Sequence, residues 1–138
     1  MLVIGSEVAE RIIDHARAEH PVEACGVVVG PSGTGEPLRF IPMVNVAASE
    51  TFYEFDSMDL LRLHRQLAAN DEELVVIYHS HTATEAVPSR TDIAYAAEPD
   101  AHYVLVSTRD QDSPHGQPEL RSFRIRDGVA REEEVRLI

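Results

Sequence analysis

Three segments of this chain are apolar almost throughout, and they limit its fold more than any other feature. They are ACGVVVG (24–30), ELVVIYH (73–79) and AHYVLVS (101–107). A strand with one face in water alternates apolar and polar residues, whereas a strand covered on both faces does not. We therefore expect these segments to be strands of a mostly buried sheet that lies between helices.

Two longer segments have the spacing of apolar residues that is typical of helices. In residues 6–20 an apolar residue returns every three or four positions, and Ser6 is the expected N-cap. Residues 56–70 repeat this pattern and begin at Asp56. A third, short helix is expected over residues 89–97. Helices therefore lie between some of the strands, which indicates an α/β or α+β arrangement.

Four further segments are expected to be strands, and they are LRFIPMVNV (38–46), TFYEF (51–55), LRSFRIR (120–126) and VAREEEVRLI (129–138). Pro42 predicts an edge strand or a bulge, because proline has no N–H to donate to a neighbouring strand. Asp127-Gly128 predicts a hairpin between the last two segments. The length of 138 residues predicts one domain that spans residues 1–138.

The charge of the chain excludes some classes of partner. It has 24 acidic and 12 basic residues, a net charge of −12. Nucleic acids and anionic membrane surfaces both attract basic faces, so neither is expected as a partner. The N-terminus lacks the regions of a signal peptide, and no stretch approaches the ~18 apolar residues of a membrane span. We therefore expect a cytoplasmic protein.

The strand over residues 73–79 ends in His79-Ser80-His81. Residues two apart in a strand point to the same face, with Cα atoms ~6.5–7 Å apart. Neutral imidazole is the commonest metal ligand near neutral pH, and two imidazoles on one face can converge on one zinc ion at ~2.0–2.1 Å. The alternative is a pair of solvated loop histidines, but the apolar strand that leads to the pair favours a metal site.

Asp92 has two interpretations. Catalytic zinc sites often combine two histidines with one carboxylate and keep a fourth position for water. The loop over residues 82–88 would let the chain fold back and bring Asp92 toward the strand end. Ser89-Arg90-Thr91-Asp92 also fits the capping pattern of a helix N-terminus. From spacing alone, a metal ligand and a simple capping residue are equally good interpretations.

These residues together resemble the JAMM motif, His-x-His-x7-Ser-x-x-Asp, which includes an upstream glutamate. His79-Ser80-His81, Ser89 and Asp92 match its spacing, and Glu23 in PVEACGVVVG stands where the family carries the glutamate. The order of helices and strands also resembles a minimal JAMM (MPN+) domain. The resemblance implies a curved mixed sheet flanked by helices, with a fold similar to that of cytidine deaminases.

The resemblance also implies a role for each residue of the motif. His79, His81 and Asp92 would bind one zinc ion per chain. Glu23 would be the general base, and Ser89 would hydrogen-bond the zinc-bound water or the oxyanion. The implied reaction is hydrolysis of a peptide or isopeptide bond after the C-terminal Gly-Gly of a ubiquitin-like protein.

The length of the chain favours a small substrate. It leaves no room for the long insertions with which some relatives hold linked ubiquitins. The chain is similar to short actinobacterial members that remove a C-terminal cysteine from a ubiquitin-like sulfur-carrier protein in cysteine biosynthesis. We therefore expect such a carrier as the partner, and a homodimer is a further expectation. The alternatives are a non-catalytic JAMM-like binding module and a deubiquitinase-like or general metallopeptidase.

Several other residues have simpler interpretations. A zinc nucleobase deaminase is excluded, because that class needs a Pro-Cys-x-x-Cys pair and Cys25 is the only cysteine. Cys25 is expected to be a small buried residue of its strand, or else a thiol near the metal. Tyr78 and Tyr95 are expected in the core, and Glu85 in solvent. The remaining histidines are expected to be surface or packing residues, and they are His15, His20, His64, His102 and His115.

Overall fold

A mixed six-stranded sheet forms the centre of the computed structural model, which describes residues 1–113, 116 and 118–138. The strand order is β3-β2-β4-β5-β6-β7, in which β4 and β5 run parallel and the other neighbours antiparallel. The strands are β2 (Cys25–Pro31), β3 (Arg39–Met43), β4 (Glu72–His81), β5 (His102–Ser107), β6 (Glu119–Arg126) and β7 (Val129–Glu133). The sheet confirms the expected fold class, and Pro42 does lie in an edge strand.

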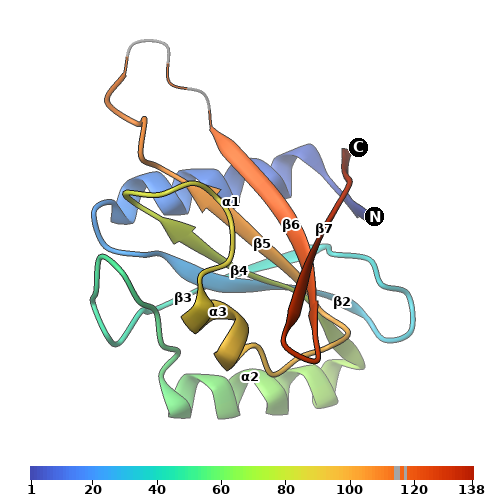
Figure 1. Ribbon diagram of the computed structural model, residues 1–138. Helices are drawn as coiled ribbons and strands as arrows, with labels where there is room; N and C mark the ends of the chain where they lie inside the picture. The colour runs from blue at the N-terminus through green and yellow to red at the C-terminus, as the bar shows by residue number, and fades with distance from the viewer. Residues whose placement is uncertain (114–115, 117) are drawn as a thin grey trace.

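Helices cover both faces of the sheet, as the apolar strands predict. α1 (Ser6–Glu19) lies on one side, and α2 (Ser57–Asn70) lies on the other (Figure 1). The short α3 (Arg90–Tyr95) is on the α2 side, where its Ile93 packs against the same core cluster as α2. Two separate apolar clusters therefore stabilise the fold, one on each face of the sheet.

Strand β4 contributes side chains to both clusters in alternation. Val76 and Tyr78 pack on the α1 side, whereas Ile77 packs on the α2 side. Side chains two residues apart share a face, so His79 and His81 continue the row that Ile77 begins. The period of the strand therefore directs both histidines to the face that α2 and α3 cover.

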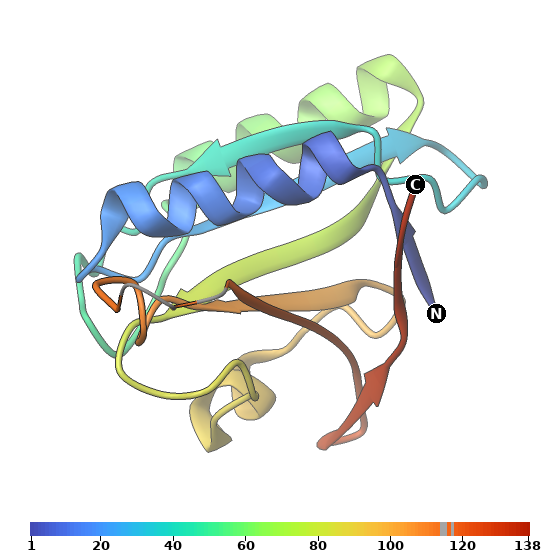
Figure 2. The same cartoon turned by 90° about the horizontal axis from the view of Figure 1, so that it is seen from above.

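The beginning of α1 differs from the prediction. Gly5 is the N-cap, and no side chain caps the helix. Ser6 is the first helical residue, and its N–H donates to the Ile138 carbonyl (2.9 Å). This contact exists because β1 (Leu2–Ile4) pairs in parallel with β8 (Val135–Leu137), which brings the two termini together (Figure 2). Ser6 as N-cap was therefore wrong, because Gly5 holds that position and a distant backbone carbonyl accepts the Ser6 N–H.

The structure confirms the predicted cap of α2 and the predicted hairpin, but it contradicts one predicted strand. Asp56 caps α2 by accepting from the Asp59 N–H (3.0 Å). Asp127-Gly128 forms the β6–β7 hairpin with positive φ at both residues, 52° and 74°. The segment 51–55 is not a strand, because only Phe55 forms an isolated bridge, to Asn45. No helix in the described part of the chain has the length and apolar character needed to cross a membrane.

Candidate metal centre

Three of the predicted site residues converge at the end of β4. The Nε2 atoms of His79 and His81 are 3.3 Å apart, and they lie 3.2 and 3.0 Å from Asp92 Oδ2. Both histidines are buried, and Asp92 comes from the first turn of α3. The strand and the returning loop therefore place two imidazoles and one carboxylate around one point.

The geometry of this group fits a tetrahedral metal ion. Ligand atoms ~2.0–2.1 Å from a tetrahedral zinc ion lie about 3.3 Å from one another. The three measured separations are close to this value. His81 Nδ1 lies 2.9 Å from the Glu85 carbonyl oxygen, to which it donates, so that Nε2 carries the lone pair a metal needs. Burial lowers the pKa of His79, which favours the neutral imidazole that binds metals.

Asp92 combines the two functions that the sequence left as alternatives. Its Oδ2 accepts a hydrogen bond from the Ser89 N–H (2.8 Å), while Ser89 Oγ accepts from the Asp92 N–H (3.1 Å). This reciprocal pair is the capping box of α3. Burial opposes ionisation of Asp92, but its contacts with the imidazoles of His79 and His81 and the hydrogen bond from the Ser89 N–H outweigh burial and hold the pKa of this carboxyl well below its usual value. The cap therefore holds an ionised carboxylate against the histidines.

Glu23 lies beside this group, just before β2. The Ser80 N–H donates to the Ala24 carbonyl (3.0 Å), which aligns the start of β2 with the histidine strand. Only 4% of Glu23 is exposed, and burial raises the pKa of its carboxyl to about 7. The charge of His81 acts to lower this pKa, and the charge of Asp92 acts to raise it. A carboxyl with such a pKa can take up and release a proton near neutral pH.

Two residues of the site were not identified from the sequence. The Tyr53 ring stacks on the His79 ring, with centroids 4.4 Å apart and an interplanar angle of 24°. Ser80, between the two histidines, accepts a hydrogen bond from the Ala24 N–H at its Oγ (2.8 Å). No sequence pattern around either residue indicates a contact with the site. Tyr53 lies in the segment 51–55, for which the sequence predicts a strand.

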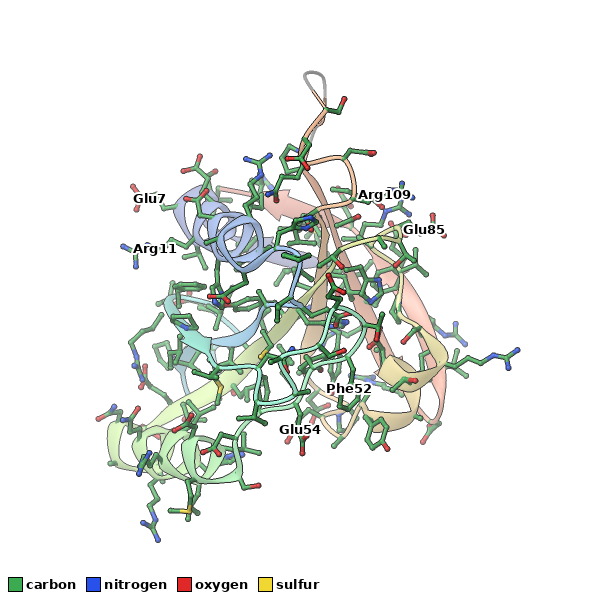
Figure 3. All side chains as sticks on the ribbon, turned by 90° about the vertical axis from the view of Figure 1, so that its left-hand side faces the viewer. Glu7, Arg11, Phe52, Glu54, Glu85 and Arg109 are labelled. Carbon is green, nitrogen blue, oxygen red and sulfur yellow. The ribbon has the colours of Figure 1, made fainter. Side chains whose placement is uncertain are left out.

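A cavity of about 460 Å³ opens beside Asp92. Aromatic and aliphatic side chains form most of its lining, with Glu54 and Glu98 as acidic members. Phe52 and Glu54 lie between α2 and α3 in the view of Figure 3. The cavity extends along β4 from Ile77 to Leu74, away from the histidines. It could therefore hold several residues of an extended peptide next to the metal group.

The remaining predictions have mixed outcomes. Tyr78 is buried as expected, whereas Tyr95 in the core was wrong, because it is 75% exposed and packs edge-on against Phe52. The Glu85 side chain is exposed (Figure 3). Cys25 is fully buried in β2, where burial raises the pKa of its thiol to about 12. The possible metal-binding group in the described residues does not include this thiol.

The other histidines contribute to packing or lie at the surface. His15 Nδ1 is 2.7 Å from the Tyr78 hydroxyl, and His20 Nδ1 is 2.7 Å from the Thr108 hydroxyl. His102 Nδ1 donates to Glu133 Oε2 (2.7 Å), and His64 is exposed. These four agree with the prediction, whereas His115 lies outside the described residues.

Comparison with known proteins identifies a family and several relatives. Residues 5–126 match the family of prokaryotic homologs of the JAB domain. CysO-cysteine peptidases of Mycobacterium tuberculosis and Mycobacterium bovis are 55% identical to this chain over 138 residues, which cover all of this chain and 92% of each relative. The desampylase of Haloferax volcanii is 29% identical over 119 residues, which cover 83% of this chain and 86% of the relative.

A solved structure shares the fold of this chain. Protein DSY2949 from Desulfitobacterium hafniense has a TM-score of 0.83 and 28% sequence identity, over 100% of this chain and 93% of that one. The family match includes the histidine pair, Asp92 and the segment with Glu23. The chain therefore belongs to the family of prokaryotic JAB-domain proteins.

Proposed function

We propose that the protein is a zinc-dependent peptidase that removes a C-terminal cysteine from a ubiquitin-like sulfur carrier, cutting after its terminal Gly-Gly. The observation that carries the metal part is the convergence of His79, His81 and Asp92, with separations of 3.0 to 3.3 Å. The substrate part is supported by the CysO-cysteine peptidases, which are 55% identical over the full chain. The reaction belongs to the biosynthesis of cysteine.

His79, His81 and Asp92 would hold one zinc ion in this proposal. Zinc at this place would lower the pKa of a coordinated water toward ~7 and polarise the scissile carbonyl. Glu23 would accept the proton of the attacking water and then donate one to the leaving amine. Without metal, burial raises the pKa of this carboxyl to about 7, and a nearby zinc ion would favour the ionised form that the first step needs.

Ser89 would stabilise the oxyanion. Its Oγ already accepts from the Asp92 N–H, so the hydroxyl hydrogen can still be donated to another acceptor. A donor directed at developing negative charge stabilises the transition state of acyl transfer. Ser89 is exposed and adjacent in sequence to the first turn of α3, so a substrate can reach it.

The cavity beside Asp92 would hold the tail of the carrier protein. The two glycines have no side chains, and an extended pair spans about 7 Å. Residues upstream of the glycines would then reach the apolar part of the cavity near Ile77. The acidic Glu54 and Glu98 disfavour a free carboxylate there, so the released cysteine would leave on another side.

The proposal also includes a single domain over residues 1–138, a homodimer and a cytoplasmic location. The homodimer could form along β3, because no other strand of the described residues pairs with its outer edge.

The experiment is mass spectrometry of a sulfur carrier that ends in Gly-Gly-Cys. The carrier is incubated with zinc-loaded enzyme, with chelator-treated enzyme and with the Glu23→Gln variant. We expect loss of one cysteine residue only with the zinc-loaded wild type. An intact carrier together with cleavage of an isopeptide-linked carrier–protein conjugate would instead favour a desampylase-like activity. Cleavage of unrelated peptides at a similar rate would indicate a general metallopeptidase.

A further inference from the structure

We propose that Tyr53 is the positioning residue of His79, and that Asn45 holds the Tyr53 segment in place. The inference rests on the proposed metal site but not on the identity of the substrate. Both residues lie in the segment between β3 and α2, which the sequence did not connect with the site. They would act on the metal through His79, without contact to the reacting atoms.

The two histidines of the site are held in different ways. A metal-bound histidine usually donates its second ring N–H to a carbonyl or carboxylate, which fixes the orientation of the ring. His81 has such a contact, from Nδ1 to the Glu85 carbonyl (2.9 Å). His79 Nδ1 is buried and has no hydrogen-bond partner among the described residues. The orientation of the His79 ring is therefore not fixed through Nδ1, as that of His81 is.

Tyr53 contacts the imidazole ring of His79. Its ring lies nearly parallel to the imidazole of His79, with centroids 4.4 Å apart. Phe55 packs edge-on against the same tyrosine, with centroids 5.7 Å apart, and so limits its movement. The stacked ring restricts rotation of the imidazole about its Cβ–Cγ bond, because rotation would drive the imidazole into the tyrosine. The stack therefore restrains the ring of His79, whose Nδ1 has no hydrogen-bond partner among the described residues.

Asn45 fixes the backbone on both sides of Tyr53. Its Nδ2 donates to the Phe52 carbonyl (2.9 Å), and its Oδ1 accepts from the Glu54 N–H (3.1 Å). Nδ2 also donates to the Glu23 carbonyl (3.0 Å), and Oδ1 also accepts from the Ala47 N–H (3.1 Å). These bonds use the two donor hydrogens and two acceptor sites of one amide.

One side chain thus connects the proposed base with the stacking residue. The contact with the Glu23 carbonyl holds the start of β2, and the contacts around Tyr53 hold the aromatic ring over His79. The amide therefore sets the distance between the segment of the base and the segment of the metal ligand. Loss of Asn45 should disturb both at once.

The test compares the zinc affinity of variants by competition with a chromophoric chelator. Tyr53→Phe keeps the ring and should bind zinc within about twofold of wild type. Tyr53→Leu removes the ring and should weaken binding about 10–100-fold, as is usual when a residue that orients a metal ligand is lost. The visible spectrum of the cobalt-substituted protein should change in Tyr53→Leu but not in Tyr53→Phe.

Two further variants distinguish the positioning of His79 from an effect on substrate binding in the cavity. Tyr53 and Tyr95 both line the cavity beside Asp92, but the ring of Tyr95 packs against Phe52. Tyr95→Leu is therefore a matched control that should change KM without changing zinc affinity. Asn45→Asp keeps the shape but loses both donated hydrogen bonds, and it should weaken zinc binding and lower kcat.

The readout also separates this inference from the proposed function. Zinc affinity is measured without substrate, so a wild type that binds zinc but leaves the carrier intact would refute only the proposed reaction. Wild-type zinc affinity in a folded Tyr53→Leu protein would refute the positioning role. Equal losses in Tyr53→Phe and Tyr53→Leu would refute it too, because the ring would then not be the cause.

Discussion

Replacing Glu23 by glutamine should make the metal-free protein more stable at alkaline pH, although it removes the proposed general base. Burial raises the pKa of the Glu23 carboxyl from 4.5 to about 7, so the fold favours its neutral form. Stability from this group is therefore fully present below the unfolded-state pKa and is lost as the pH rises through about 7. Glutamine keeps the shape of the neutral carboxyl and cannot ionise.

The size of this effect on the unfolding free energy follows from the folded and unfolded pKa values of Glu23. A pKa difference of one corresponds to about 1.4 kcal/mol, so ionising Glu23 lowers the unfolding free energy by about 3 kcal/mol at pH 8 and by less than about 1 kcal/mol at pH 5. Glu23→Gln should therefore have an unfolding free energy higher than that of wild type by these amounts. The comparison must be made without metal, because a bound cation near Glu23 would favour its ionised form and reduce the difference.

The assay is urea unfolding of the chelator-treated proteins at pH 5 and pH 8. The exposed α1 residue Glu10 offers a matched control, and Glu10→Gln should follow wild type at both pH values. A stability difference between Glu23→Gln and wild type that is the same at both pH values would refute the reasoning. After zinc loading, Glu23→Gln should keep its metal and lose about 10²–10⁴-fold in rate, as expected for a lost general base.

Further predictions concern the metal, the helix cap and the core. Wild type should contain about one zinc per chain, since the three ligands form one site, and His81→Ala should lose most of it in elemental analysis. Ser89→Ala should lower the unfolding free energy by about 1 kcal/mol, because Ser89 caps α3, and it should reduce the rate less than Glu23→Gln does. Leu105→Ala should lower the unfolding free energy in urea by about 2–5 kcal/mol, since Leu105 is fully buried in the cluster on the α2 face; a loss below 1 kcal/mol would contradict that packing.

The sequence alone predicted those features that depend only on residues close together in the chain. The period of a strand put His79 and His81 on one face, and the continuous apolar run of residues 73–79 required cover on both sides. The capping box of Ser89 and Asp92 involves residues only three apart, so the sequence could show it. The hairpin at Asp127-Gly128 could likewise be predicted from these two residues, because both readily adopt positive φ.

Tertiary structure decided what depends on residues distant in the sequence. Asp92 both caps α3 and faces the histidines, because the 82–88 loop returns its carboxylate to within 3.2 Å of both Nε2 atoms. The segment 51–55 has the composition of a strand, yet Asn45 holds it as a loop and stacks Tyr53 on His79. The Ile138 carbonyl accepts the Ser6 N–H because β1 pairs with β8. Each of these contacts joins two segments that lie far apart along the chain. The composition and periodicity of one segment do not show which other segment it will contact.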